Sequence, residues 1–334
     1  MNLPKLKTQI VLLLENHYSS LYKLEKIETQ GLHYLELKSS DGTSKAQISL
    51  NQGGRLSHLV FEDIQVLADF DASTYENNYA SSILFPFVNR IKDGKYTFNN
   101  ITYKLNCNEV DKNNALHGLV YNKTFVCTKK VLTLNYASVT LQYKDDGRHQ
   151  GFPFKFNIEL TYTLNKKGII VSVNIANKDE KPFPFSLGWH PYFYSKNLYA
   201  STLNFSSNKK YIFDNQKIIS GTADITIEMP FQLKAVTLDD CYPLTTNGID
   251  FSTPEYSFKI GSTSEENFLQ LYTPEVPNII AIEPTTGAAD NFNNKIGLQT
   301  LQPKETYNMK WLMEIQTRKN KINTNQLIKK ICNS

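Results

Sequence analysis

The amino-acid sequence predicts an all-β protein built from antiparallel strands. Apolar residues alternate with polar ones along extended segments throughout the 334-residue chain, as they do in strands with one buried face. No sustained 3.6-residue period is present, and short turn signals separate the segments. Many strands joined by short turns, without helices between them, favour an antiparallel sandwich or barrel over a parallel α/β sheet.

Three consecutive segments show this alternation most clearly. Residues 155–175 predict a hairpin, and residues 136–144 are expected to pair beside it. The apolar positions on the buried faces are Val139, Leu141, Tyr143, Phe156, Ile158, Leu160, Tyr162, Leu164, Ile169, Val171, Val173 and Ile175. The expected turns carry Asp41-Gly42, Gly53-Gly54, Asp93-Gly94, Asp146-Gly147, Lys167-Gly168 and Asn247-Gly248.

No change of composition divides the chain, so residues 1–334 are predicted to form one domain with its core at about residues 30–317. The apolar run 10–14 is too short for a secretory or membrane segment and is expected to be a first strand or a leading extension. Two helices are expected, at 67–75 and 323–331. The second lies in a basic tail, 318–334, which either binds an acidic surface or is a solvated end.

Composition and charge exclude several classes of function. The formal net charge is only +4, and the scattered Lys and Arg residues argue against a nucleic-acid groove. The cysteines show no pairing or regular spacing, which indicates neither a zinc site nor a disulfide framework and favours the cytoplasm. They are Cys107, Cys127, Cys241 and Cys332. The 19 Tyr and 19 Phe residues suit a β core or a cleft that binds rings.

Five short stretches place polar groups among apolar or aromatic residues. The stretch 279–284 is an apolar run that ends in Glu283 followed by a proline. Glu283 is either a solvated strand end or an acid–base group that is held rigidly because the proline fixes the backbone after it. Arg90, in 85–91, either pairs with a buried carboxylate or points its donors into a cleft. His117 and His190 stand beside glycine or proline, and Asp239 begins an adjacent aspartate pair of the kind typical of turns or exposed clusters.

The two histidines and Glu283 are compared with the requirements of metal binding, nucleophilic catalysis or phosphate binding, and acid–base catalysis. Metal binding is disfavoured because the HExxH spacing is absent, and no DxDxDG calcium loop follows Asp239. Neither a nucleophile elbow nor a phosphate-binding glycine loop occurs. A histidine whose pKa lies near neutral pH can form an acid–base pair with a nearby carboxylate. A lone histidine among aromatic residues, however, is more often a core residue.

Six motifs in a fixed order resemble those of the aldose 1-epimerase (galactose mutarotase) family over about residues 53–311. They are NRI at 89–91, LHG at 116–118, WHPYF at 189–193, LDD at 238–240, LQLYT at 269–273 and EP at 283–284. The resemblance implies a galactose-mutarotase-like β-supersandwich with an open sugar-binding cleft. It also implies a free-sugar substrate, no cofactor and no metal.

The resemblance also implies roles for seven residues. Glu283 matches the general base that takes the proton from the anomeric hydroxyl, and His190 matches the general acid that protonates the ring oxygen. His117 matches the histidine that hydrogen-bonds the sugar near the reacting atoms. Arg90 and Asp239 match residues that hold hydroxyls, with Asn89 and Gln270 as further contacts. Trp189 and Tyr192 either pack on the sugar or belong to the core.

The predicted activity is interconversion of the α and β anomers of a free aldohexose such as glucose or galactose, by a monomer or weak homodimer without nucleic-acid or membrane partners. Glu283 is expected to be ionised and His190 protonated at rest. Pro191 stands where well-known galactose enzymes have a serine, so the motif does not determine which sugar is preferred. The rivals are a hexose-6-phosphate 1-epimerase, disfavoured because Tyr121 stands where those enzymes have an arginine, and a silent sugar-binding module.

Overall fold

In the computed structural model, residues 20–68, 74–234 and 237–318 are described, and they form antiparallel β-sheets. The α-helices in these ranges are single turns, α2 (Tyr75–Asn78) and α3 (Asn291–Asn294). Two 3-10 turns accompany them, η2 (Lys92–Gly94) and η3 (Leu198–Ala200). The all-β, antiparallel prediction is therefore confirmed.

The largest sheet has nine strands. In spatial order they are β11 (Val126–Leu132), β12 (Tyr136–Asp146), β13 (Lys155–Asn165), β14 (Gly168–Asn177), β28 (Thr306–Thr317), β24 (Tyr256–Ser262), β23 (Gly248–Ser252), β18 (Thr202–Phe205) and β21 (Phe231–Gln232). The predicted hairpin is β13 and β14, and β12 pairs beside it. That prediction is confirmed, down to alternate burial along β13 and β14.

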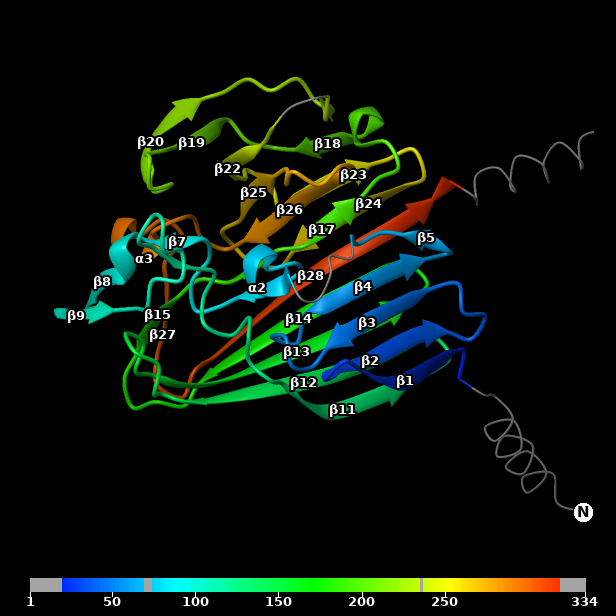
Figure 1. The fold of residues 1–334 in the computed structure, drawn as a ribbon, viewed down its shortest axis with the longest axis horizontal. Helices are drawn as coiled ribbons and strands as arrows, with labels where there is room; N and C mark the ends of the chain where they lie inside the picture. Colours follow the sequence, from blue (N-terminus) through cyan, green and yellow to red (C-terminus); the bar gives the residue numbers. More distant parts are fainter. Residues whose placement is uncertain (1–19, 69–73, 235–236, 319–334) are drawn as a thin grey trace, which may run out of the picture.

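A five-stranded sheet covers the β11–β14 half of the large sheet (Figure 1). Its strands are β1 (Tyr22–Thr29), β2 (Leu32–Ser39), β3 (Lys45–Ser49), β4 (Leu56–Phe61) and β5 (Ile64–Gln65). The hydroxyl of Tyr162 on β13 donates to the carbonyl oxygen of Gly54 at 2.7 Å. Contacts of this kind hold the two layers together in the buried space between them.

A six-stranded sheet lies against the other half and carries most of the predicted site. Its order is β22 (Asp239–Pro243), β25 (Phe268–Tyr272), β26 (Ile279–Thr285), β16 (Gly188–Trp189) and β6 (Ile83–Leu84), with β17 (Tyr192–Tyr194) also paired to β26. The rings of Phe193 on β17 and Phe258 on β24 have centroids 4.4 Å apart. The six-stranded sheet therefore packs directly on the nine-stranded sheet.

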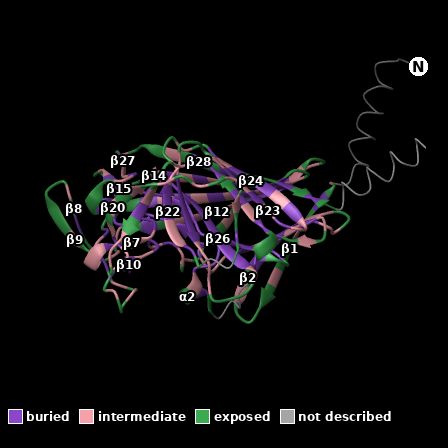
Figure 2. Ribbon diagram, turned by 90° about the horizontal axis from the view of Figure 1, so that it is seen from above, coloured by how far each residue is buried: buried purple, intermediate pink, exposed green. Residues whose placement is uncertain are grey.

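Short two-stranded sheets complete the structure. They are β7 (Arg90–Ile91) with β10 (Ala115–Leu116), β8 (Lys95–Phe98) with β9 (Ile101–Lys104), β15 (Phe183–Phe185) with β27 (Gln299–Leu301), and β19 (Lys209–Phe213) with β20 (Ile219–Asp224). Figure 2 shows buried residues along the strands of the interior, whereas much of the β8–β9 hairpin is exposed. The β7–β10 and β19–β20 pairs flank the site.

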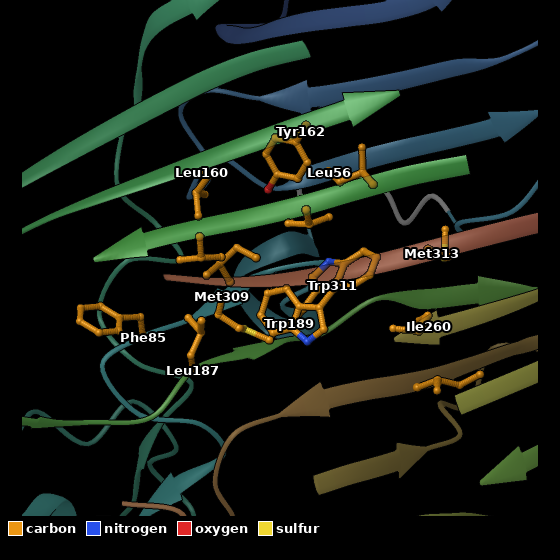
Figure 3. Packing of buried hydrophobic residues seen from close by; sticks show 14 of the residues in the cluster. Leu56, Phe85, Leu160, Tyr162, Leu187, Trp189, Ile260, Met309, Trp311 and Met313 are labelled. Atoms are coloured by element: carbon orange, nitrogen blue, oxygen red, sulfur yellow. The ribbon is translucent and has the colours of Figure 1, made fainter. Parts of the chain in front are cut away.

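The core is continuous between the layers. One hydrophobic cluster contains residues from all three large sheets. At its centre the indole rings of Trp189 on β16 and Trp311 on β28 lie 6.1 Å apart (Figure 3). Strand β28 alternates exposed and buried side chains, as a strand with one buried face should.

One local prediction is wrong and others lie outside the described residues. The helix expected at 67–75 is wrong at its start, because Leu67 forms a β-bridge with Phe193 and the Ala68 N–H donates to the Tyr192 carbonyl, while the described helix α2 covers Tyr75–Asn78. Residues 10–14, the helix at 323–331 and most of the basic tail lie outside the described ranges. The one-domain prediction for residues 1–334 stays a prediction. No helix in the described ranges is long and apolar enough to cross a bilayer.

Candidate active site

All seven predicted site residues line one cavity of about 240 Å³. Its walls come from the six-stranded sheet, the β7–β10 pair and the loops beside α2. The seven are Asn89, Arg90, His117, His190, Asp239, Gln270 and Glu283. A larger cavity of about 500 Å³, bounded by residues 198–199 and 273–279, contains none of them and has only Lys234 and Glu275 as ionisable carboxylate or amine groups. The smaller cavity is therefore the candidate site.

Glu283 lies within β26 and not at its end, because the strand continues to Thr285. Every residue of β26 is buried, and the Glu283 side chain faces the cavity with the residue only 3% exposed. Gln270 stands directly opposite on β25, and Cys241 opposes Gln270 on β22. Since it is buried, Glu283 is not a solvated strand end, and that alternative is excluded.

His190 connects β16 to β17 and is held by its backbone. Its N–H donates to the Ser82 carbonyl at 3.0 Å, and its carbonyl accepts from the Ser81 N–H at 2.8 Å. The side chain is 6% exposed, and its Nε2 atom lies 3.4 Å from Oε1 of Glu283. The Nδ1 atom has no hydrogen-bond partner among the described residues. One ring nitrogen is thus directed at Glu283.

His117 reaches the same place from the loop after β10. Its backbone adopts a left-handed φ of 61°, and its N–H donates to the Asn89 carbonyl at 2.8 Å. The next residue must be glycine, because a Cβ on Gly118 would meet the Phe85 carbonyl oxygen at 2.3 Å. The His117 ring stands edge-on to His190, with centroids 4.9 Å apart. The two histidines and Glu283 therefore form one cluster.

Arg90 combines both alternatives left open by the sequence. Its Nε and NH2 groups donate to the two carboxylate oxygens of Glu109 at 2.8 and 2.7 Å, a bidentate pair. Its third nitrogen donates to Oδ1 of Asn89 at 3.1 Å. Arg90 also lines the cavity. Glu109 therefore orients the guanidinium at the wall of the cavity.

Asp239 begins strand β22, so the expected turn or exposed cluster is wrong at this position. Its Oδ1 atom accepts from Nε2 of Gln270 at 3.1 Å, and Oδ2 accepts from the Lys217 ammonium at 2.7 Å. Gln270 in turn accepts a long hydrogen bond of 3.5 Å from Asn89. The side chain is held from two sides while still lining the cavity.

Burial governs the protonation of the central pair. It raises the pKa of Glu283 well above its ordinary value, with the Asp239 charge adding to this and Arg90 opposing it. It lowers the pKa of His190 to about 4. The pKa of His117 is also lowered by burial, and then by His190 and Arg90. These shifts favour neutral groups, opposite to the charged pair expected from the sequence.

Several residues in or beside the cavity were missed by sequence reasoning. Glu109 lies in a loop with no motif, and burial alone would raise its pKa, but hydrogen bonds from Arg90 and Asn114 hold it low. Lys217 stands in the β19–β20 turn without any local signal. Tyr79, Tyr192 and Tyr272 supply aromatic walls. Of the two aromatics considered, Tyr192 lines the cavity, whereas Trp189 belongs to the core.

The described residues hold no group of three or more His, Cys, Asp or Glu side chains arranged for a metal ion. Cys107, Cys127 and Cys241 are free thiols, and Cys332 lies outside the described ranges. What the cavity offers is a carboxyl group, two imidazoles, a guanidinium and several amide and carboxylate groups. This set can move protons and bind hydroxyls without a covalent step.

Three antiparallel sheets thus hold a buried carboxyl–imidazole pair in a polar cavity. The chain belongs to the aldose 1-epimerase family, whose model matches residues 35–314. That match extends further toward the N-terminus than the resemblance in the motifs. A curated relative, the uncharacterized protein YihR of Escherichia coli K12, is 23% identical over 271 residues, which cover 75% of this chain and 83% of YihR.

Solved structures share the fold. A galactose mutarotase-like protein from Clostridium acetobutylicum superposes with a TM-score of 0.80 at 20% identity, covering 89% of this chain and 99% of that one. A galactose 1-epimerase from Lactobacillus acidophilus gives 0.71 at 17% identity, covering 90% and 99%. The predicted galactose-mutarotase-like fold is therefore confirmed.

Proposed function

We propose that this protein is an aldose 1-epimerase that interconverts the α and β anomers of a free aldohexose such as glucose or galactose. One observation carries the proposal: the Glu283 carboxyl and the His190 imidazole lie 3.4 Å apart, buried, inside a cavity lined by hydroxyl-binding groups. Family membership supports the reaction class. An acid and a base so close together can act on two oxygens of one small ring.

The reaction needs one proton removed and one delivered. Ionised Glu283 takes the proton from the anomeric hydroxyl on O1, while protonated His190 gives a proton to the ring oxygen O5. The C1–O5 bond breaks and leaves an aldehyde at C1. Rotation about C1–C2 presents the other carbonyl face, and the two groups then close the ring with their roles reversed. Atoms and protons balance without a cofactor.

The resting protonation state is compatible with this cycle. Neutral Glu283 with neutral His190 and ionised Glu283 with protonated His190 contain the same number of protons and the same net charge. One proton transfer across the 3.4 Å gap interconverts them. Hydroxyl groups of a bound sugar would donate hydrogen bonds to the carboxylate, and the Arg90 charge already favours its ionised form. Substrate binding therefore favours the reactive arrangement.

The remaining side chains suit hydroxyl recognition. Arg90 and Asn89 offer N–H donors, whereas Asp239 retains acceptor capacity on both oxygens. Gln270 joins the two sides of the cavity. His117 is placed to hydrogen-bond the sugar near the reacting atoms, because its ring touches that of His190. Each of these roles is part of the proposal.

An unphosphorylated sugar fits the charge of the cavity better than a sugar phosphate. Among the described residues that line it, Arg90 is the only Lys or Arg, and Glu109 already pairs with its charge. A phosphate would need cations that are not committed elsewhere. We propose that the protein acts in the cytoplasm as a monomer or weak homodimer.

Polarimetry on freshly dissolved α-glucose and α-galactose tests the proposed activity. The protein should speed equilibration, and Glu283→Gln or His190→Ala should each reduce the catalysed rate by roughly 10²- to 10⁴-fold. His33→Ala is the matched control, because the His33 side chain is half exposed on β2 and forms an ion pair with Glu28, outside the cavity. No acceleration with any free hexose would contradict the proposal. A preference for a hexose 6-phosphate would favour a hexose-6-phosphate 1-epimerase. Sugar binding without any acceleration would favour a silent sugar-binding module.

A further inference from the structure

The tip of the β19–β20 hairpin, residues 214–218, lies beside the cavity, and the hairpin packs against β22 (Figure 1). Its turn is built by Asp214, whose carboxylate accepts from the N–H groups of Gln216 and Ile218 at 2.9 and 3.0 Å. Lys217 between them has a left-handed φ of 61°. The turn thus projects the Lys217 side chain onto Asp239, at 2.7 Å.

The same tip is fastened to the opposite wall of the cavity. The side chain of Gln216 donates to the Lys112 carbonyl at 3.2 Å, and its backbone carbonyl accepts from Asn114 at 2.9 Å. Asn114 also donates to Glu109, the carboxylate that orients Arg90. The hairpin tip therefore connects the supports of both residues proposed to hold sugar hydroxyls, Arg90 and Asp239.

We propose that Lys217 is a sugar-positioning residue: its ammonium and the Gln270 amide fix the two oxygens of Asp239 in the orientation that receives the sugar. The inference rests on the proposed function of the cavity. Without Lys217, the Asp239 carboxylate keeps, among the described residues, a side-chain hydrogen bond on one oxygen only, and the side chain, one-third exposed, can turn toward solvent. Gln270 alone does not define the orientation of the carboxylate.

A neighbouring ion pair supplies an internal comparison. Lys210 on β19 binds Asp240 on β22 at 2.6 Å, with Lys210 side-chain exposure of 37% against 39% for Lys217. Adjacent residues of a strand point to opposite faces, and Asp240 does not line the cavity. Both pairs join the same hairpin to the same strand, and only the Lys217 pair includes a cavity residue. A purely structural role would make the two pairs equivalent.

Lys217 also balances charge beside the acid–base pair. The groups acting on Glu283 are Asp239 from β22, which favours its protonated form, and Arg90 from β7, which opposes this. His190, Gln270, Tyr192 and the buried thiol of Cys241 surround it without adding a fixed charge. Removing the Lys217 cation leaves the Asp239 charge uncompensated. Both proton-binding steps of the Glu283–His190 pair then move to higher pH.

Lys217→Met in the full chain tests the inference, with Lys210→Met as the matched control and Lys217→Arg as the conservative variant. On a sugar that the wild type accepts, Lys217→Met should raise KM roughly 10-fold and move both limbs of the pH profile upward. Lys217→Arg should restore most of KM. Lys210→Met should match the wild type in KM and pH profile.

Calorimetric titration of the same sugar into Glu283→Gln, with and without Lys217→Met, measures positioning without turnover. Binding should weaken roughly 10-fold in the double variant. Wild-type KM and pH limbs in Lys217→Met, or an equal loss in Lys210→Met, would overturn the role of Lys217 while leaving the mutarotase activity intact. Binding that depends on Lys217 in a protein that accelerates no sugar would overturn the proposed function alone. Absence of any sugar binding would overturn both.

Discussion

At the scale of single residues, the Glu283–His190 pair is one acid–base unit. Burial penalises a charge on either group, so a lone glutamate or histidine at this position would be neutral. Together the two groups share one proton at zero net charge, whichever of them carries it. Their individual pKa values therefore matter less than the range of pH over which the pair keeps a single proton.

The pH profile of kcat/KM should be bell-shaped with a broad plateau across neutrality. On the acid side the pair binds a second proton and loses its base. Burial disfavours that cation, which lowers the pKa of His190 and moves this limb below neutrality. On the alkaline side the pair loses its last proton and its acid. Burial disfavours the resulting anion, which raises the pKa of Glu283 and moves this limb upward.

Polarimetry over a series of buffers, with each spontaneous rate subtracted, measures this profile. The limbs should flatten in Glu283→Gln, because His190 remains but has no carboxyl group with which to share a proton. A profile that is flat throughout, or one that falls steeply within the neutral range, would contradict the shared-proton assignment.

The site residues divide into those that sequence could identify and those that it could not. The resemblance predicted Glu283, His190 and His117 because each stands in a motif of fixed local sequence. Glu109 and Lys217 act through tertiary contacts made by loops without a motif, so no local pattern distinguishes them from other surface charges. The protonation state was also beyond reach, since it depends on burial that only the folded chain reveals.

At the scale of elements, positioning of the histidines depends on tight backbone turns. The loop after β10 (Ala115–Leu116) brings His117 to the cavity by packing Gly118 against the backbone of Phe85. The Leu119 N–H then donates to the Phe85 carbonyl at 2.7 Å. This contact leaves no space for a side chain, so the loop position is defined by one missing Cβ.

Gly118→Ala should destabilise the protein by about 2–4 kcal/mol and lower mutarotation at temperatures where it stays folded. An alanine there combines a left-handed φ of 78° with a Cβ placed 2.3 Å from a carbonyl oxygen. Gly261→Ala on β24 is the control, because no atom lies within 4 Å of its added Cβ. Urea unfolding and polarimetry measure both effects. Equal stability of the two variants would refute the role of the close contact.

Element prediction from sequence succeeded where one face is buried and failed where tertiary contacts decide. Strands β13 and β14 follow the alternating pattern along their length, whereas β12 follows it except at the buried Ser138 and the half-buried Tyr143. The segment 67–75 carries no such pattern. Its first two residues, Leu67 and Ala68, are held by backbone contacts to β17 and do not begin a helix. The seven buried residues of β26 show no alternation because sheet partners and core cover both faces.

At the scale of the whole molecule, strand β28 joins the two halves of the large sheet. It pairs with β14 on one side and β24 on the other, and Trp311 faces Val171 and Ser262 in the two registers. Its indole contacts that of Trp189, the residue before His190 (Figure 3). The seam that connects the layers therefore also supports the catalytic histidine proposed here.

The two tryptophans should respond differently to the same substitution. Both are nearly fully buried, at 0% exposure for Trp189 and 1% for Trp311. The Trp189 indole donates to the Ser81 hydroxyl at 2.9 Å, whereas the Trp311 N–H has no acceptor among the described residues. An unsatisfied buried donor costs about 1–3 kcal/mol. Replacement by phenylalanine removes that cost at Trp311 and breaks a made hydrogen bond at Trp189.

Trp311→Phe should therefore lower the free energy of unfolding by at least about 1 kcal/mol less than Trp189→Phe does, although both substitutions remove a similar side-chain volume. Trp189→Phe should also reduce mutarotation more, because it frees Ser81, whose N–H donates to the His190 carbonyl. Urea unfolding midpoints with a common m-value give the first comparison, and polarimetry gives the second. Equal midpoints would show that the indole N–H groups contribute equally, and would remove hydrogen bonding as the reason that the seam positions His190.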